Sequence, residues 1–129
     1  MIVVDTSVWI NFLKGARSGT ALRIRSGEFV DEIVVGDIVL LEVLQGARDR
    51  RHARELESGL RLFRIEAMLD ERLARQAADY YRTLRGFGVT VRKTADLIIA
   101  TFCIDRGYAL LHEDRDFTPM AAHLGLKVI

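Results

Sequence analysis

The chain has 129 residues, half of them hydrophobic and 29% charged, with a formal net charge of +1 at pH 7. We expect one domain over residues 1–129, and this composition excludes a disordered chain. No apolar run reaches the roughly 18 residues that span a bilayer, so we expect no membrane segment. The N-terminus lacks the basic region of a signal peptide, which predicts a cytoplasmic protein. A single cysteine excludes an internal disulfide and a thiolate metal cluster.

The nearly neutral net charge conceals an arginine-rich surface. Sixteen of the 19 basic residues are arginine. If five of the 18 acids belong to one site, 13 acids remain against 19 basic residues, which leaves a formal charge of +6. Such a body suits a polyanionic partner, although arginine as a general surface cation explains the composition equally well.

Short apolar runs alternate with helical patterns in the first half of the chain. Ile2–Val4 is predicted to be a buried strand that leads into a helix. Ile33–Val35 is predicted to be a second strand, followed by a helix from a turn and cap at Gly36-Asp37 to about Gly46. The charged stretch Arg48–Arg54 indicates a solvated helix, and a third strand is expected within residues 60–65.

The second half of the chain continues the alternation. An amphipathic pattern predicts a long helix from about Met68 to Leu84. Thr94 is expected to cap a helix over residues 95–104 that is apolar nearly all round and therefore buried. Further strands are predicted at residues 108–111 and 126–129. The pattern predicts an α/β fold with a central, mostly parallel β-sheet flanked by helices on both faces.

Five carboxylates fall where open α/β sheets build their sites, beyond strand ends or early in helices. Asp5 ends the first strand, Asp114 and Asp116 follow the strand at 108–111, Asp96 lies in the first turn of the buried helix, and Glu42 lies among leucines and valines. Unpaired carboxylates are costly among apolar neighbours, so we expect a metal or a cation beside them. Oxygen ligands suit Mg²⁺, with Mn²⁺ as the alternative.

Each acid also has a purely structural explanation. Asp5 is a candidate helix cap, Asp96 complements a helix dipole, and Asp114 and Asp116 suit a turn. Glu42 is a candidate partner for a nearby arginine. Because all five fall at strand ends or helix starts, one shared site explains them more economically than five coincidences.

Four segments carry a resemblance to a known family. They are Val4–Ile10 (VDTSVWI), Leu41–Gly46 (LEVLQG), Thr94–Ala100 (TADLIIA) and Leu110–Phe117 (LLHEDRDF). In this order they resemble the four signature regions of PIN-domain nucleases and, more narrowly, the VapC toxins of bacterial toxin–antitoxin pairs. The resemblance covers essentially the whole chain. It implies a PIN fold with an acidic pocket at the strand ends.

The resemblance also implies roles for individual residues. The family's metal-site aspartates and its motif glutamate correspond to Asp5, Asp96, Asp114, Asp116 and Glu42. Which of the last two aspartates contacts metal directly stays open. A hydroxyl that often supports the pocket corresponds to Thr6 or Ser7, and Asn11 stands where many relatives carry aspartate.

The expected activity is a Mg²⁺-dependent endoribonuclease that acts as the toxin of a toxin–antitoxin pair. We expect Asp5 and Asp96 to hold the first metal ion, Asp114 or Asp116 to complete its shell, and Glu42 to orient or deprotonate a bound water. Arg92 or Arg115 are candidates to hold flanking phosphates.

The expected partners are an RNA substrate, a small cognate antitoxin and a second copy of the chain. The antitoxin is expected to cover the acidic pocket with a basic side chain. The homodimer is expected to use apolar helices around Trp9 and residues 68–84.

Three other functions compete with this hypothesis. A DNA-acting nuclease is scarcely distinguishable by sequence. A non-catalytic, partner-binding subunit of a DNA-regulatory complex is disfavoured because none of the five acids is missing. A phosphatase with an aspartyl nucleophile would want a second acid two residues after Asp5, where the chain has Ser7.

Overall fold

The computed structural model describes residues 1–129 and contains one five-stranded sheet in which every strand pair is parallel. The strand order is β3-β2-β1-β4-β5, so the first strand is central. This confirms the expected α/β class. The strands are β1 (Ile2–Val4), β2 (Ile33–Gly36), β3 (Arg64–Glu66), β4 (Ala109–Leu111) and β5 (Lys127–Val128).

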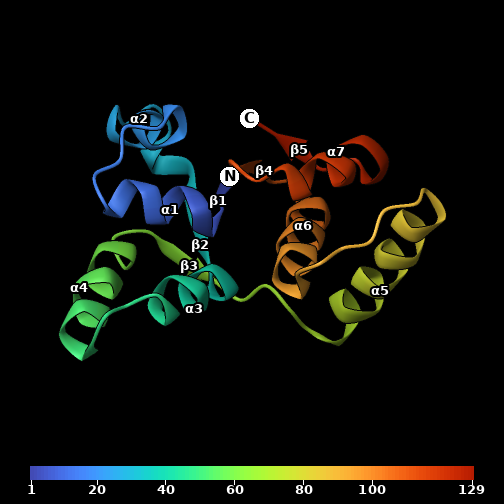
Figure 1. Ribbon diagram of the computed structural model, residues 1–129, viewed down its shortest axis with the longest axis horizontal. Helices are drawn as coiled ribbons and strands as arrows, with labels where there is room; N and C mark the ends of the chain where they lie inside the picture. Colours follow the sequence, from blue (N-terminus) through green and yellow to red (C-terminus); the bar gives the residue numbers. More distant parts are fainter.

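Helices cover both faces of the sheet, as expected. Helices α1 to α4 lie on one side and α5 to α7 on the other (Figure 1). The connections from β1 to β2 and from β2 to β3 run in one direction along the sheet, and the chain then crosses back to β4 and continues to β5 in the other direction. Because crossovers between parallel strands are right-handed, the helices of these two sets of connections lie on opposite faces of the sheet. The helices are α1 (Thr6–Leu13), α2 (Gly19–Arg25), α3 (Asp37–Gln45), α4 (Arg50–Leu60), α5 (Glu71–Gly86), α6 (Thr94–Arg106) and α7 (Thr118–Leu124).

The core lies between the helices and the sheet. Val34 and Leu110, from strands on either side of β1, are completely buried, as expected for parallel strands covered on both faces. Trp9 is 1% exposed and packs against Phe12 and Phe63. The Trp9 ring is therefore part of this core. No helix is long and apolar enough to cross a membrane.

The long helix α5 begins later than the sequence pattern indicates. Its first residue is Glu71, and Asp70 caps it by accepting a hydrogen bond from the backbone N–H of Leu73 at 2.8 Å. Met68 lies before the helix, fully buried, and its backbone N–H donates to the Asp37 carboxylate at 3.0 Å. Because Asp37 binds this distant segment, the cap of α3 is Gly36, and Asp37 is the first helical residue.

Other boundaries also differ from expectation. Thr94 is the first residue of α6, and Lys93 holds the cap position without a side-chain hydrogen bond. The third strand is Arg64–Glu66, because α4 continues through Leu60. Two short helices, α2 and α7, were not predicted; at seven residues each they show little periodicity.

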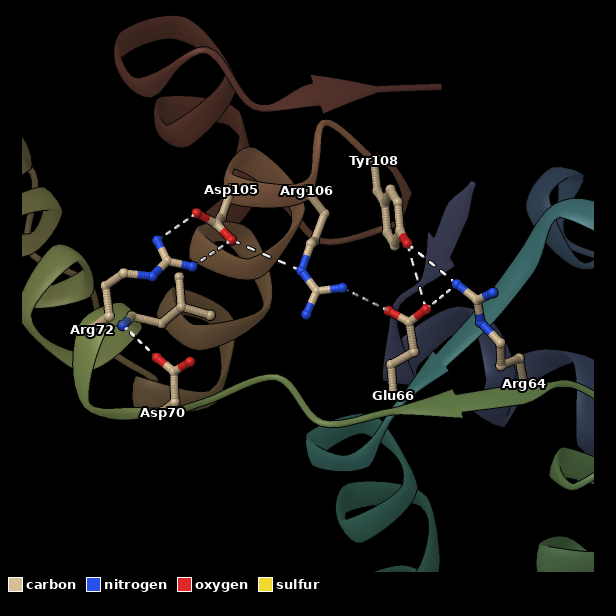
Figure 2. A network of polar contacts seen from close by, with 8 residues as sticks. Arg64, Glu66, Asp70, Arg72, Asp105, Arg106 and Tyr108 are labelled. Atoms are coloured by element: carbon tan, nitrogen blue, oxygen red, sulfur yellow. Dashed lines mark hydrogen bonds and ion pairs between the residues drawn. The ribbon is translucent and has the colours of Figure 1, made fainter.

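A polar network holds the end of α6 against β3 and α5 (Figure 2). The Glu66 carboxylate accepts hydrogen bonds from Arg64, from the Tyr108 hydroxyl and from Arg106. Arg72 of α5 forms a bidentate pair with Asp105 at 2.7 and 3.0 Å. These contacts restrain the direction of α6, whose opposite end carries Asp96.

Gly36 lies where β2 contacts the buried Met68 side chain. A Cβ at this position would lie 2.0 Å from Sδ of Met68. We expect Gly36→Ala to lower the free energy of unfolding by about 1–3 kcal/mol, because the close-packed core cannot accept the added atom without strain. Urea denaturation measures this change.

Gly59→Ala is the matched control for that substitution. Its Cβ would meet only a Leu13 methyl group at 4.0 Å, within helix α4. It should leave stability unchanged or raise it by up to about 1 kcal/mol, because alanine favours helices. Equal stability of Gly36→Ala and the wild type would contradict the packing described here.

Candidate metal centre

An acidic cavity of about 260 Å³ opens at the carboxyl ends of β1 and β4. These strands flank the point where the connections change face, which is where open α/β sheets bind ligands. Helices α1, α3 and α6 complete its walls. The lining residues are Asp5, Thr6, Ser7, Ile10, Glu42, Gln45, Lys93, Asp96 and Asp114.

Asp5 combines a structural position with a place in the cavity. It caps α1, with its carboxylate accepting hydrogen bonds from the Ser7 hydroxyl at 2.7 Å and the Ser7 backbone N–H at 3.3 Å. Its own backbone N–H donates to the Leu111 carbonyl at 2.9 Å, which ties the end of β1 to β4. The side chain is nevertheless 4% exposed and lines the cavity, so the capping role and the site role coexist.

Asp96 is the most electrostatically disfavoured of the carboxylates. It is 5% exposed, and its buried Oδ2 has no hydrogen-bond partner. Burial, the largest cause, and the neighbouring Asp5 charge raise the pKa of Asp96 to about 7, and Lys93 opposes the shift. A buried carboxylate oxygen without a donor needs either a proton or a cation, and both are consistent with a metal site.

Asp114 and Asp116 approach Asp96 from the short 3₁₀ helix Arg115–Phe117, which follows β4. Asp114 caps this helix by accepting from the Asp116 backbone N–H at 2.9 Å. One carboxylate oxygen from each of Asp96, Asp114 and Asp116 lies within 4.8 Å of the others. This spacing fits a divalent cation held by oxygen ligands.

The five predicted acids therefore lie near one another, but they do not share one wall. Asp116 faces a neighbouring hollow of about 180 Å³, which Arg92 and Arg115 also line. The three oxygens that fit a single ion come from Asp96, Asp114 and Asp116, whereas Asp5 is bound to Ser7. Asp5 and Asp96, the expected first pair, both line the acidic cavity, and their joint binding of a metal ion stays a prediction.

Glu42 extends into the cavity from α3. Its Oε1 accepts a hydrogen bond from the Thr6 hydroxyl at 2.7 Å. The partner of Glu42 is thus the Thr6 hydroxyl, and Glu42 forms no ion pair with the arginine that the sequence analysis considered. Because this hydrogen bond uses only one oxygen, the second carboxylate oxygen of Glu42 stays available to a water molecule.

Sequence reasoning missed two parts of the site. Lys93 lines the cavity, with its Nζ 4.0 Å from Asp114 Oδ2, and its position directly before the TADLIIA segment was the signal. Glu113 accepts hydrogen bonds from Asn11 of α1 and Thr20 of α2, and thereby anchors the loop that carries Asp114. An aspartate at position 11 would be unable to donate this bond.

Two further side chains have no place in the site chemistry. Burial raises the pKa of Cys103 to about 12, and its side chain is completely buried, so Cys103 is a core residue. His112 packs against Phe117, and its Nδ1 is buried without a partner.

Comparison with known proteins agrees with this geometry. Residues 2–122 match the model of the PIN domain. The chain is 32% identical to VapC ribonuclease Mb1587 of Mycobacterium bovis and to ribonuclease VapC11 of Mycobacterium tuberculosis, over 98% of this chain and 96% of each relative.

Several solved structures have the same fold. One is FitAcB from Neisseria gonorrhoeae, with a TM-score of 0.78 and 19% identity over 100% of this chain and 96% of that chain. Another is VapBC2 from Rickettsia felis bound to a promoter DNA fragment, with a TM-score of 0.76 and 16% identity over 100% and 98%. The chain therefore belongs to the PIN-domain family, and its relatives include the VapC ribonucleases.

Proposed function

We propose that this protein is a metal-dependent endoribonuclease, the toxin of a toxin–antitoxin pair, and that residues 1–129 act as one PIN domain. The observation that carries the proposal is the cluster of Asp96, Asp114 and Asp116, in which a buried oxygen of Asp96 has no partner. Its near relatives by sequence are ribonucleases, which supports RNA as the substrate.

The carboxylates would hold Mg²⁺, with Mn²⁺ as the alternative. Asp96, Asp114 and Asp116 provide the compact oxygen set, and Asp5 adds negative charge within the same cavity as Asp96 and Asp114. A bound divalent cation lowers the pKa of water and relieves charge on phosphoryl oxygens. Asp96 fits this role because its ionised form is disfavoured in the absence of a cation.

The remaining cavity residues suit phosphodiester hydrolysis. Water oxygen bonds to phosphorus as the bond to the leaving ribose oxygen breaks, and the water proton passes to a base. Glu42 is our proposed base, because Thr6 fixes its carboxylate at the cavity wall. Lys93 is exposed at the rim and suited to contact a flanking phosphate.

Two alternatives predict different results in the same assay. A DNA nuclease with this centre would cut DNA in preference to RNA, and a non-catalytic subunit would cut neither. The intact acidic cluster disfavours the second alternative.

Asp96→Asn tests the proposal most directly. With structured RNA as substrate, we expect wild-type cleavage in Mg²⁺ and none in EDTA. The variant should lose at least 100-fold in cleavage rate, because one metal-binding oxygen is replaced by an amide. Its Mg²⁺-induced rise in melting temperature should also shrink, since stabilisation by a ligand follows affinity. A variant that cuts RNA at the wild-type rate would refute the assigned centre.

The same variant should reveal the cost of the buried charge. In metal-free wild type the pKa of Asp96 is about 7, above its value in the unfolded chain, so folding takes up a proton between about pH 4 and 7. Stability is therefore highest below this range and falls as the pH rises through it. In EDTA, the stability advantage of Asp96→Asn over wild type should grow between pH 5 and pH 8, on the order of 2 kcal/mol. A pH-independent difference would show that burial and repulsion do not act on this group.

We propose a small antitoxin as the protein partner. Structures that share this fold include a toxin–antitoxin complex from Klebsiella pneumoniae and a member of the VapBC family of toxin–antitoxin systems from Mycobacterium tuberculosis. A basic side chain from the partner would satisfy the free oxygen of Asp96 and exclude the metal. Co-expression with the small neighbouring gene should give a stable complex, relieve toxicity and abolish the Mg²⁺-induced rise in melting temperature. Absence of both a complex and relief would argue against it.

We also propose a homodimer that uses α5. An apolar groove of about 340 Å³ lies between α5 and α6, and Leu69 at its edge is 45% exposed. Such a surface is suited to burial against a second copy. Light scattering at micromolar concentration should give twice the 14.6 kDa of the chain, and Ala78→Arg in the groove should return it to that mass. A wild-type mass of one chain would contradict the dimer.

A further inference from the structure

A second hollow adjoins the acidic cavity between α1, α3 and α4. Its volume is about 450 Å³, within the range of about 300–1,000 Å³ typical of small-molecule sites. Ile10 lines both the acidic cavity and this hollow, so the two lie side by side. We propose that it binds the nucleoside next to the cleaved phosphodiester and that its rim holds the adjoining phosphate. This inference rests on the proposed ribonuclease function.

The floor of the hollow is apolar. Ile10 and Leu13 come from α1, Val43 from α3 and Leu56 from α4. Leu13 and Leu56 are only partly buried, although they pack against the core. Enzymes that act on nucleic acids commonly hold a base between apolar side chains, because every base has an apolar face. The floor therefore offers packing to a base.

The rim of the hollow is cationic. Lys14, Arg48 and His52 are its charged or titratable residues, and no acid lines it. Neither Lys14 nor Arg48 forms an ion pair within the chain, in contrast to Arg61 and Arg72, which pair with neighbouring acids. Charge complementarity thus favours an anionic occupant.

His52 gives the rim a defined hydrogen-bond donor. Its Nδ1 accepts from the Arg48 backbone N–H at 3.1 Å, and its own backbone N–H donates to the Asp49 cap at 2.8 Å. Because Nδ1 accepts, the ring proton lies on Nε2, the remaining nitrogen of the ring. The rim is therefore organised before any ligand binds.

The shared residue Ile10 and the unpaired basic residues of the rim favour RNA over a protein segment. A strand whose scissile phosphate lies at the carboxylates must place a neighbouring nucleoside along the cavity wall. On the wall formed by Ile10, that nucleoside meets the apolar floor, and its next phosphate meets the unpaired cations. A partner protein in the hollow is the competing explanation, and the experiment below separates the two.

Charge removal tests the rim. Arg48→Ala and Lys14→Ala are made in the cleavage-impaired Asp96→Asn background and bound to a fluorescein-labelled, 12-nucleotide RNA of mixed sequence in EDTA. Fluorescence anisotropy at several salt concentrations gives the RNA association constant. The logarithm of this constant should fall less steeply with the logarithm of salt concentration in each variant than in Asp96→Asn alone, by about 0.7 in slope for each lost phosphate contact. Arg54→Ala is the control, because Arg54 lies exposed on the same helix α4 outside the hollow.

Filling the hollow tests the nucleoside. Gly46 lines it with a φ of −80°, and a Cβ there would approach nothing closer than the Val43 carbonyl at 3.5 Å, so a side chain is tolerated. Wild type and Gly46→Ala should share a base preference at one position beside the cut in a randomised 12-nucleotide RNA library. Gly46→Phe should lose this preference and at least 10-fold in kcat/KM, with the Mg²⁺-induced rise in melting temperature unchanged.

The outcomes separate this inference from the proposed function. Unchanged salt slopes together with an unchanged base preference in Gly46→Phe would overturn the nucleoside subsite and leave the ribonuclease intact. If these variants weaken only the complex with the small neighbouring protein, the hollow is a protein site and the inference is wrong. If wild type neither binds nor cuts the RNA, the proposed function fails and the subsite fails with it.

Discussion

Repulsion between confined carboxylates is the constraint on which the rest of this structure depends. Asp5, Glu42, Asp96 and Asp114 surround about 260 Å³, and Asp96 is buried there with one oxygen unpaired. Such an arrangement opposes folding at neutral pH, because neither water nor a full set of donors offsets the charge. It persists because the surrounding elements fix each acid from a different direction, so that no single side-chain movement relieves the repulsion.

The frame that fixes the acids is built from very short strands. β1 and β4 have three residues each, yet their side chains are almost all buried and their ends are tied by the hydrogen bond from Asp5 to Leu111. The polar network around Glu66 restrains the far end of α6, and Glu113 anchors the loop before Asp114. Polar contacts thus supplement the core at the points where orientation of the acids matters.

Sequence patterns predicted the parts of this protein that depend on local chemistry. Alternating apolar runs gave the α/β class, and the strand-end positions of Asp5 and Asp114 gave the site, because parallel strands bring their carboxyl ends to one edge. Details decided by distant contacts were not accessible. Met68, which lies before α5, donates its backbone N–H to Asp37, 31 residues away, and Trp9 packs against Phe63, 54 residues away. Lys93 lines the cavity, and its only signal in the sequence was its position directly before the TADLIIA segment.

The positions of the basic residues follow from the same repulsion. A cation deep in the cavity would pair with the carboxylates and compete with metal, and the one that lines it, Lys93, is 61% exposed and 4.0 Å from Asp114. Arg92 and Arg115 line the hollow of about 180 Å³ that Asp116 faces. Lys14 and Arg48 line the separate hollow of about 450 Å³ between α1, α3 and α4. Basic residues at this distance attract a polyanion without neutralising the acids beneath it. Without a bound cation the carboxylates would repel the phosphate that these residues draw in, so metal loading and RNA binding are expected to reinforce each other through one electrostatic balance.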